Sequence, residues 1–172
     1  MTLPERKANR LPGYDYSQNG AYFVTICTKN RERILCDIVV GDGVLDVPQV
    51  RLTNFGQAVK KRIEEMNDTY DFISVDKYVI MPNHIHLIVR IDFPQGGTSR
   101  TPSPTNAVIP HFISTLKRFV NQDVGTNIWQ RSYHDHIIRD DADYLQIWQY
   151  IDENPLKWQD DCFYTEERNE RQ

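Results

Sequence analysis

Hydrophobic and polar residues alternate along four segments of this chain in a way that is typical of strands. Residues 21–28, AYFVTICT, form a β-branched and aromatic run after a glycine and predict a strand. Residues 72–82 and 84–91 predict two more strands, and a Met-Pro-Asn step between them suits a tight hairpin turn. Residues 128–139, IWQRSYHDHIIR, mix β-branched and aromatic side chains and predict a fourth strand.

Three other segments carry apolar residues at helical spacing. Residues 54–71 place apolar side chains three and four positions apart with charged residues between them, which predicts an amphipathic helix. Residues 111–125 repeat this pattern and stop at Gly125. Residues 140–155 begin with an aspartate cap and end at Pro155, so they predict a third helix.

The connecting segments are rich in turn-forming residues. Residues 40–52, VGDGVLDVPQVRL, predict a small hairpin or an irregular excursion. Residues 92–110 combine proline, glycine, serine and threonine, and we expect a mobile loop rather than a domain boundary. We therefore expect residues 1–172 to form a single domain, with a tail at 159–172 that has no role we can derive.

The order of the predicted elements is strand, helix, strand, strand, helix, strand, and then a terminal helix. This is the βαββαβ pattern of a ferredoxin-like α+β fold, an antiparallel sheet with two helices on one face. The other face is open unless the last helix lies across it.

The net charge of the chain is only weak evidence against binding to nucleic acid. The net charge is −4, with 24 acidic against 20 basic residues, whereas binding to nucleic acid needs local lysine and arginine. Residues 1–33 nevertheless hold six basic and three acidic residues, a local charge of +3. This split allows an anion site on one side of the molecule, or simply a solvated basic tail.

Composition also bears on where the protein acts. No run of about 18 apolar residues exists, so we expect no membrane segment. The first residues are followed by no apolar region of the kind found in signal peptides. The three cysteines have no metal-type spacing, which favours free thiols and a cytoplasmic location.

Two histidines stand out in the third predicted strand. Because side chains alternate across a strand, His84 and His86 share one face with Ile88 and Arg90. The opposite face is purely aliphatic and suits contact with the two crossover helices. Imidazole is a common metal ligand, so the pair either fills space or takes a metal or catalytic role.

The last predicted helix carries a second candidate group. Tyr144, Trp148 and Ile151 form an apolar stripe, with Leu145 at its edge. Tyr150 and Asn154 are four residues apart and lie on one face, turned away from the centre of that stripe. Asn154 precedes Pro155, so we expect it to end the helix and to reach outward.

The motifs MPNHIHLIV and WQYIDENP together are similar to those of the single-tyrosine HUH transposases, in particular the REP-associated tyrosine transposases. His84-Ile85-His86 matches the His-hydrophobic-His element of that family. The resemblance covers about residues 14–158, which we take as the core of the domain. It also implies a ferredoxin-like sheet.

The resemblance implies a site and a reaction. Tyr150 would be the nucleophile, and His84, His86 and Asn154 would bind a divalent cation, Mg²⁺ or Mn²⁺. The tyrosine would attack a phosphodiester of single-stranded DNA, displace a 3′-hydroxyl and form a 5′-phosphotyrosine link that can be passed to another end. Related stand-alone enzymes act on repeat hairpins, so the expected partners are single-stranded DNA or DNA hairpins, with no membrane partner. The protein could act as a monomer or a homodimer.

Several other side chains could contact DNA. The N-terminal basic segment, with the nearby Tyr14 and Tyr16, could bind phosphates and stack on bases. We give His136 a supporting role beside the metal ligands because its strand leads into the last helix. The basic residues that we predict as DNA contacts are Arg6, Lys7, Arg10, Lys117, Arg118, Arg131 and Arg139.

Two other functions fit the same residues. The chain could be a catalytically inactive DNA-binding descendant, although the nucleophile and every ligand are present. It could also be a metal-dependent phosphoesterase that uses His84 and His86 while Tyr150 is incidental.

Overall fold

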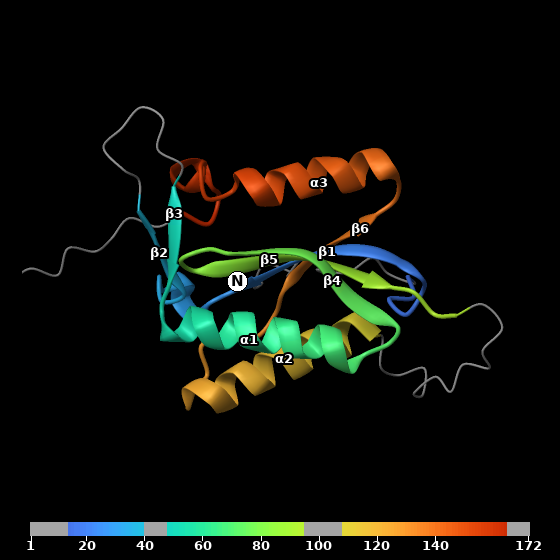
Figure 1. Ribbon diagram of the computed structural model, residues 1–172, viewed down its shortest axis with the longest axis horizontal. Coiled ribbons are helices and arrows are strands. Elements are labelled where there is room, and N and C mark those ends of the chain that lie inside the picture. The colour runs from blue at the N-terminus through green and yellow to red at the C-terminus, as the bar shows by residue number, and fades with distance from the viewer. Residues whose placement is uncertain (1–13, 40–47, 95–107, 165–172) are drawn as a thin grey trace, which may run out of the picture.

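The computed structural model describes residues 14–39, 48–94 and 108–164 of the 172-residue chain (Figure 1). Its centre is a four-stranded antiparallel sheet in the order β4-β5-β1-β6. The strands of this sheet are β1 (Gly20–Cys27), β4 (Ile73–Ile80), β5 (His84–Ile91) and β6 (His134–Ile138).

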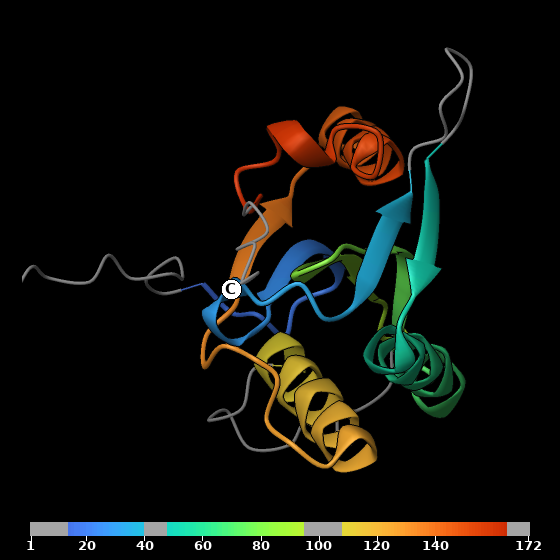
Figure 2. The same cartoon turned by 90° about the vertical axis from the view of Figure 1, so that its left-hand side faces the viewer.

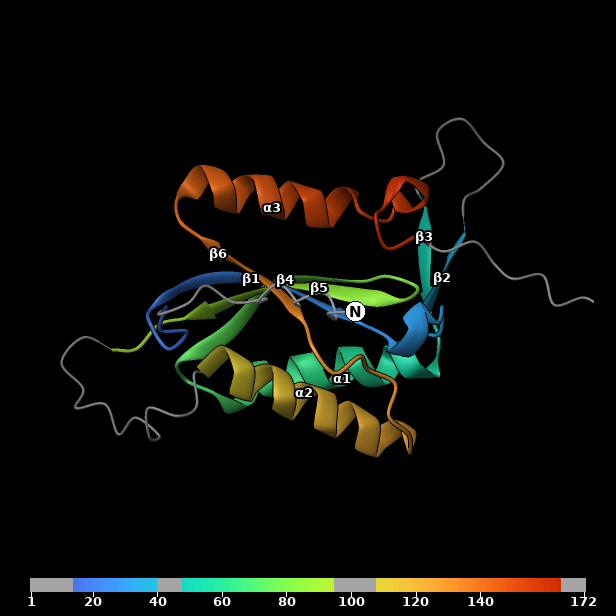
Figure 3. The same ribbon diagram turned by 180° about the vertical axis from the view of Figure 1, so that it is seen from behind.

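Helices cover both faces of the sheet. The helices α1 (Asn54–Thr69) and α2 (Val108–Val124) pack side by side on one face, and α3 (Asp141–Glu153) lies across the other (Figures 1 and 3). The view along the sheet in Figure 2 shows the three layers. The predicted ferredoxin-like α+β fold is confirmed, and the face that the sequence left open is covered by the last helix.

The main core lies between the sheet and the helices α1 and α2. As the alternation of β5 predicts, Ile85, Leu87, Val89 and Ile91 are buried there. Burial of side chains of this size stabilises the fold by about 1.5–3 kcal/mol each. One face of β5 is therefore buried in the main core, and His84 and His86 lie on the opposite face, which α3 covers.

Helix α3 is held by a much smaller apolar cluster. That cluster consists of Ala21, Ile88, Ile147 and Ile151, with Tyr144 and Trp148 packed against it. Ile147 replaces Leu145 in the stripe that the sequence suggested, because Leu145 is exposed.

Polar contacts complete the attachment of α3 to β4. The Tyr144 hydroxyl and Arg90 Nε both donate to Asp76 Oδ2, at 3.0 and 2.6 Å. Lys77 pairs with Asp152 at 2.5 Å, and its ammonium lies 4.6 Å from the centre of the Trp148 ring.

Two predicted boundaries are wrong. Helix α2 begins at Val108, so the end of the predicted 92–110 loop belongs to the helix. Pro110 falls in the first helical turn, where backbone N–H groups have no intrahelical acceptor and proline is tolerated. Residues 95–107 of that loop lie outside the described ranges.

The last strand is shorter than predicted. Only His134–Ile138 pair with β1, and Trp129 makes one isolated bridge to Thr28. Between them, the Lys117 ammonium donates to the carbonyl oxygens of Gln130 and Ser132 at 2.8 and 2.9 Å. A side chain thus takes the place of a neighbouring strand for these backbone groups.

A separate hairpin pairs β2 (Cys36–Val39) with β3 (Gln49–Leu52) and stands at one end of the sheet (Figure 1). It agrees with the small hairpin predicted near residues 40–52, although its first strand begins earlier. Residues 40–47 lie outside the described ranges. Among the helices in the described part of the chain, none has the length and apolar character needed to cross a membrane.

The start of α1 depends on a close approach to Leu35. Thr53 caps the helix by accepting the backbone N–H of Gly56 at 3.2 Å, while its own N–H donates to the Leu35 carbonyl at 3.0 Å. A Cβ placed on Gly56 would lie 2.1 Å from that carbonyl oxygen. Only glycine fits at this position.

We expect Gly56→Ala to destabilise the protein by about 1–3 kcal/mol, because the methyl group must displace backbone atoms. Urea unfolding followed by circular dichroism measures this change. Gln57→Ala, at the exposed neighbouring position, should change the stability by less than about 0.5 kcal/mol. Equal midpoints for the two variants would contradict the predicted clash.

Candidate active site

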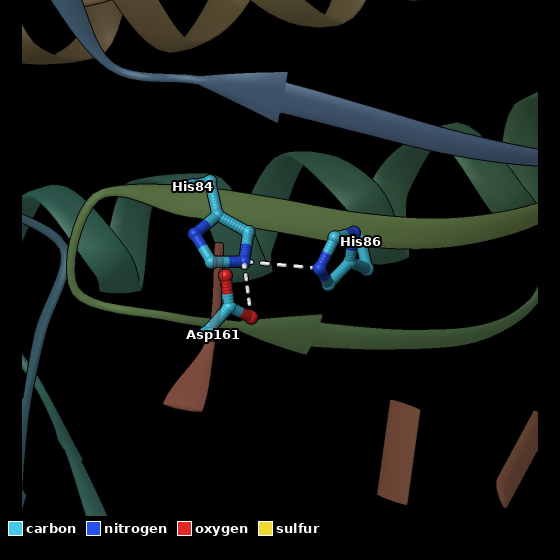
Figure 4. Close-up of side chains that lie close together, drawn as sticks. All are labelled: His84, His86 and Asp161. Carbon is cyan, nitrogen blue, oxygen red and sulfur yellow. Dashed lines mark hydrogen bonds and ion pairs between the residues drawn. The ribbon is translucent and has the colours of Figure 1, made fainter. Parts of the chain in front are cut away.

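The two histidines of β5 lie together in a buried position below α3. The exposed fractions of His84 and His86 are 0% and 1%. Their Nε2 atoms are 3.0 Å apart and are joined by a dashed line in Figure 4. A tight turn precedes them, in which the Met81 N–H donates to the His84 carbonyl at 2.9 Å.

Asn83 determines which nitrogen of His84 carries the proton. Asn83 Nδ2 donates to the Phe163 carbonyl at 2.7 Å, which orients the amide, and Asn83 Oδ1 lies 2.8 Å from His84 Nδ1. Because an amide oxygen can only accept, the proton of neutral His84 is on Nδ1. The lone pair of Nε2 therefore points toward His86.

The partner of His86 is a hydroxyl group, which can donate or accept. Thr25 Oγ1 lies 2.8 Å from His86 Nδ1. With no ion between the rings, Nε2 of His86 must carry the proton that it shares with His84, and Thr25 donates to Nδ1. When a cation takes both Nε2 lone pairs, the His86 proton moves to Nδ1 and Thr25 accepts it.

Burial keeps both imidazoles neutral at pH 7. Loss of solvent lowers the pKa of His84 to about 3, and the positive charge of Arg31 contributes to this shift. Loss of solvent also lowers the pKa of His86 well below its usual range, with a smaller effect from His84. Neutral imidazole is the form that binds metal ions.

A carboxylate from beyond α3 joins the pair. Asp161 Oδ2 lies 3.9 Å from His84 Nε2, and the Asp161 side chain is only 2% exposed (Figure 4). Within the described ranges, no lysine or arginine lies at ion-pair distance from it. A buried carboxylate beside two neutral rings lacks a compensating positive charge.

Tyr150 brings a hydroxyl group to the same place. Its oxygen lies 3.3 Å from His86 Nε2 and 3.5 Å from Asp161 Oδ2. The side chain is 41% exposed, so this end of the site is open to solvent. Burial of the ring, assisted by the charge of Asp161, raises the pKa of Tyr150 to about 12. The phenol is therefore protonated at pH 7.

Asn154 lies one turn after Tyr150, and the expectation that it reaches outward is wrong. It is only 3% exposed and keeps helical dihedral angles, so its side chain turns inward. Asn154 Nδ2 donates to Asp161 Oδ2 at 3.0 Å. Its Oδ1 is buried with no hydrogen-bond partner in the described structure.

These residues fit a divalent cation. Two nitrogen ligands that bind one ion at right angles, each at about 2.1 Å, lie about 3 Å apart. In the described part of the chain, His84, His86 and Asp161 form a group with ligand atoms within 4.8 Å of one another. A cation at this point would give the buried Asn154 oxygen a partner and would offset the charge of the Asp161 carboxylate.

The chain has relatives in Haemophilus influenzae. It is 32% identical over 182 residues to an uncharacterised protein of that organism, and the alignment covers 95% of this chain and 96% of that protein. It is 24% identical over 149 residues to a second protein, described as a REP-associated tyrosine transposase, covering 83% of this chain and 74% of that one. No family model matches the chain.

A solved structure shares the fold. It is a REP-associated tyrosine transposase bound to a REP hairpin, with a TM-score of 0.59 and 22% identity, covering 92% of this chain and 74% of that one. The chain is therefore similar in sequence and in fold to REP-associated tyrosine transposases. Of the residues that the transposase-like motifs singled out, Tyr150 contacts His86 Nε2 directly, and Asn154 reaches the histidine pair through Asp161.

Several predicted DNA contacts of this transposase relative lie away from the site. Lys117, predicted as a DNA contact, is half-buried, and its ammonium donates to the backbone carbonyls of Gln130 and Ser132. Tyr16 is buried in the core, which removes it from base stacking, whereas Tyr14, which packs on it, is partly exposed. Arg118 is exposed on α2, and Tyr150 is part of α3, the helix on the opposite face of the sheet (Figure 1).

The remaining predicted contacts have different outcomes. Arg131 and Arg139 are exposed, and Arg139 immediately precedes the Asp140 cap of α3. The contacts of these two residues with DNA stay predictions. The N-terminal residues Arg6, Lys7 and Arg10 lie outside the described ranges.

His136 does not touch the histidine pair. Its Nε2 lies 2.8 Å from Asp143 Oδ2 at the start of α3. On the neighbouring strand, Phe23 lies opposite His136 and stacks on His86 at 5.1 Å between ring centres. The aromatic ring thus separates His136 from the site, and the supporting role given to it is wrong.

Sequence reasoning missed Asp161, Thr25 and Asn83. Thr25 could have been found, because Tyr22, Val24 and Ile26 mark the core face of β1 and place Thr25 on the other. Asn83 directly precedes the His84 motif. Asp161 lies in the tail 159–172, to which we gave no role. The sequence around it has neither the alternation of a strand nor the spacing of a helix, so no local pattern predicts where its side chain lies.

Protonation of the histidines should make folding pH-dependent. The unfolded chain takes up these protons near pH 6.5, whereas folded His84 does so at about pH 3. The stabilisation is therefore present above pH 6.5 and is lost as the pH falls toward 3, by up to about 1.4 kcal/mol per pH unit for each histidine.

We expect His84→Gln to flatten the fall in unfolding free energy between pH 7 and pH 5, measured by urea titration in EDTA. His111→Gln, at an exposed position on α2, should keep the parent slope. If all three proteins have the same slope, His84 is not buried in its neutral form.

Manganese should stabilise the folded protein by binding at this site. At about 100 times the dissociation constant, the gain is about 2.7 kcal/mol. We expect His84→Gln and His86→Gln to abolish the Mn²⁺-induced rise in melting temperature, and Asp161→Asn and Asn154→Leu to weaken Mn²⁺ binding at least about tenfold.

Asp160→Asn is the matched control for these variants, because it removes the neighbouring, exposed carboxylate. It should bind Mn²⁺ like the parent, as measured by isothermal titration calorimetry. Equal affinities for Asp160→Asn and Asp161→Asn would remove Asp161 from the ligand set.

Proposed function

We propose that this protein cleaves single-stranded DNA with Tyr150 and transfers the cut strand through a 5′-phosphotyrosine link. The observation that carries the proposal is the position of the Tyr150 hydroxyl, 3.3 Å from His86 Nε2 in a buried pair of neutral histidines. A nucleophile beside a ready cation site is the arrangement that phosphodiester cleavage requires.

Each residue would have a separate task. The Tyr150 oxygen forms the new bond to phosphorus, and the bond from phosphorus to the 3′-oxygen breaks. Asp161, 3.5 Å from the hydroxyl, is the carboxylate within reach of the phenol proton. The departing 3′-oxygen takes up a proton, so that charge balances over the step. Reversal by another 3′-hydroxyl restores the free tyrosine and completes the transfer.

His84 and His86 would hold a divalent cation, Mg²⁺ or Mn²⁺, with oxygen from Asp161 and Asn154. Such an ion would polarise the phosphate oxygens and offset the charge that develops on them. Asn83 and Thr25 would keep the Nε2 lone pairs of the two rings aimed at the ion. Asn154 would in addition hold Asp161 in place through its Nδ2.

The substrate we propose is a DNA hairpin with a flanking single strand. The related solved structure holds a REP hairpin, and the 41% exposure of Tyr150 is compatible with the approach of a DNA strand. Because the energy of the broken bond is kept in the phosphotyrosine, the reaction needs no nucleotide triphosphate.

A denaturing gel tests the proposal. A labelled hairpin oligonucleotide with a single-stranded flank is incubated with the protein and Mn²⁺. We expect a covalent protein–DNA adduct, reduced at least about a thousandfold in Tyr150→Phe because the nucleophilic oxygen is gone. Tyr70→Phe removes the same atom from a half-buried tyrosine at the end of α1 and should leave the adduct unchanged.

Other outcomes identify the two competing functions. Cleavage without an adduct that survives Tyr150→Phe would replace the transferase with a metal-dependent phosphoesterase. Binding of the hairpin without cleavage in either Mg²⁺ or Mn²⁺ would leave a catalytically inactive DNA-binding protein.

A further inference from the structure

A basic turn lies at the same end of the sheet as His84. Cys27, the last residue of β1, pairs with His84, and the short 3-10 helix Lys29–Arg31 follows. Thr28 anchors this turn, since its N–H donates to the Asn83 carbonyl at 2.9 Å and its side chain contacts the Glu32 carbonyl at 2.8 Å. The turn is therefore tied to the residue that orients His84.

The backbone of this turn adopts an uncommon shape for its residues. Asn30 and Arg31 have φ angles of 54° and 57°, a left-handed conformation that residues other than glycine rarely adopt. Such strain persists only where the surrounding structure fixes it, and it is enriched at functional sites. Here the strained position carries a guanidinium group.

The guanidinium of Arg31 is fixed beside the site but keeps most of its hydrogen-bonding capacity. Its Cζ lies 5.1 Å from the centre of the Phe163 ring, and Nη1 donates to the Cys162 carbonyl at 3.3 Å. Phe163 in turn lies 4.7 Å from the His84 ring. Across the described ranges, no carboxylate lies at ion-pair distance from Arg31, which is an exposed residue.

The same arrangement occurs a second time in the turn. Arg33 Cζ lies 5.7 Å from the centre of the Trp158 ring, which also belongs to the segment after α3. Two guanidinium groups thus lie over rings of the segment that supplies Asp161. Contact with a ring holds a guanidinium in place, and the exposed Arg31 group can then bind a phosphate through two hydrogen bonds.

We propose that Arg31 binds a DNA phosphate that flanks the one attacked by Tyr150. This inference rests on the proposed function for the identity of the ligand as a nucleic acid strand. A strand that brings its phosphate to the Tyr150 hydroxyl must continue past the site in both directions. The Phe163 ring contacts both the Arg31 guanidinium and the His84 ring. In the described ranges this guanidinium has no acidic partner, so its positive charge is available to a phosphate on one side of the site.

The experiment measures binding alone, so that it is independent of cleavage. A short fluorescent single-stranded oligonucleotide is titrated with Tyr150→Phe protein in EDTA, at several salt concentrations, by fluorescence anisotropy. Arg31→Gln in this background removes the charge but keeps a planar group that can donate to the Cys162 carbonyl. We expect the affinity to fall about tenfold and the slope of log K against log salt to decrease by about 0.7, the value for one phosphate contact.

Lys61→Ala is the matched control, because it removes one exposed positive charge from α1 on the other side of the sheet. It should change neither the slope nor the affinity. Arg31→Lys should keep the slope and recover part of the affinity, since the charge remains without the planar fork. Melting curves of the variants show that each is folded.

The inference is overturned if Arg31→Gln keeps the parent slope, or if Lys61→Ala lowers it equally. It is also overturned if the Tyr150→Phe protein does not bind the oligonucleotide. Failure of the proposed function has a different signature, because a protein that forms no adduct in Mn²⁺ would still show the loss of slope in Arg31→Gln.

Discussion

The site depends on the close contact of two nitrogen atoms whose lone pairs would repel one another without a proton or a cation between them. His84 cannot relieve this contact, because Asn83 holds its proton on the far side of the ring. His86 can, because Thr25 accepts or donates as required. One hydroxyl group therefore allows the same buried geometry to be stable both with and without an ion.

That contact is in turn set by the main core. The strand β5 places aliphatic side chains between the sheet and the helices α1 and α2, and a shift of its register by one residue would bury the histidines in that core. Apolar burial on one face thus fixes the imidazoles on the other with little local freedom. The Tyr150 hydroxyl is less constrained, since it belongs to a helix attached by few apolar residues.

The sequence predicted the parts of the structure that follow a period. The alternation in β5 placed His84 and His86 on one face, and the helical spacing placed Tyr150 and Asn154 together. It failed where geometry comes from single contacts. Pro110 lies inside α2 because it occupies the first turn, and β6 is short because Lys117 satisfies the preceding carbonyls. Asp161 reaches the site through an irregular segment whose path depends on contacts such as that of Asn83 with Phe163, which no local pattern encodes.

The attachment of α3 gives the two halves of the site different stabilities. The histidines share the sheet with the main core, so their amide hydrogens exchange with solvent only when much of the protein unfolds. Tyr150 is on a layer held by a few isoleucines, the Asp76 contacts and the Lys77 pair. Separating that layer costs less free energy than global unfolding. A DNA end attached to Tyr150 would therefore be carried by the most easily displaced element around the site, while the two imidazoles stay in place.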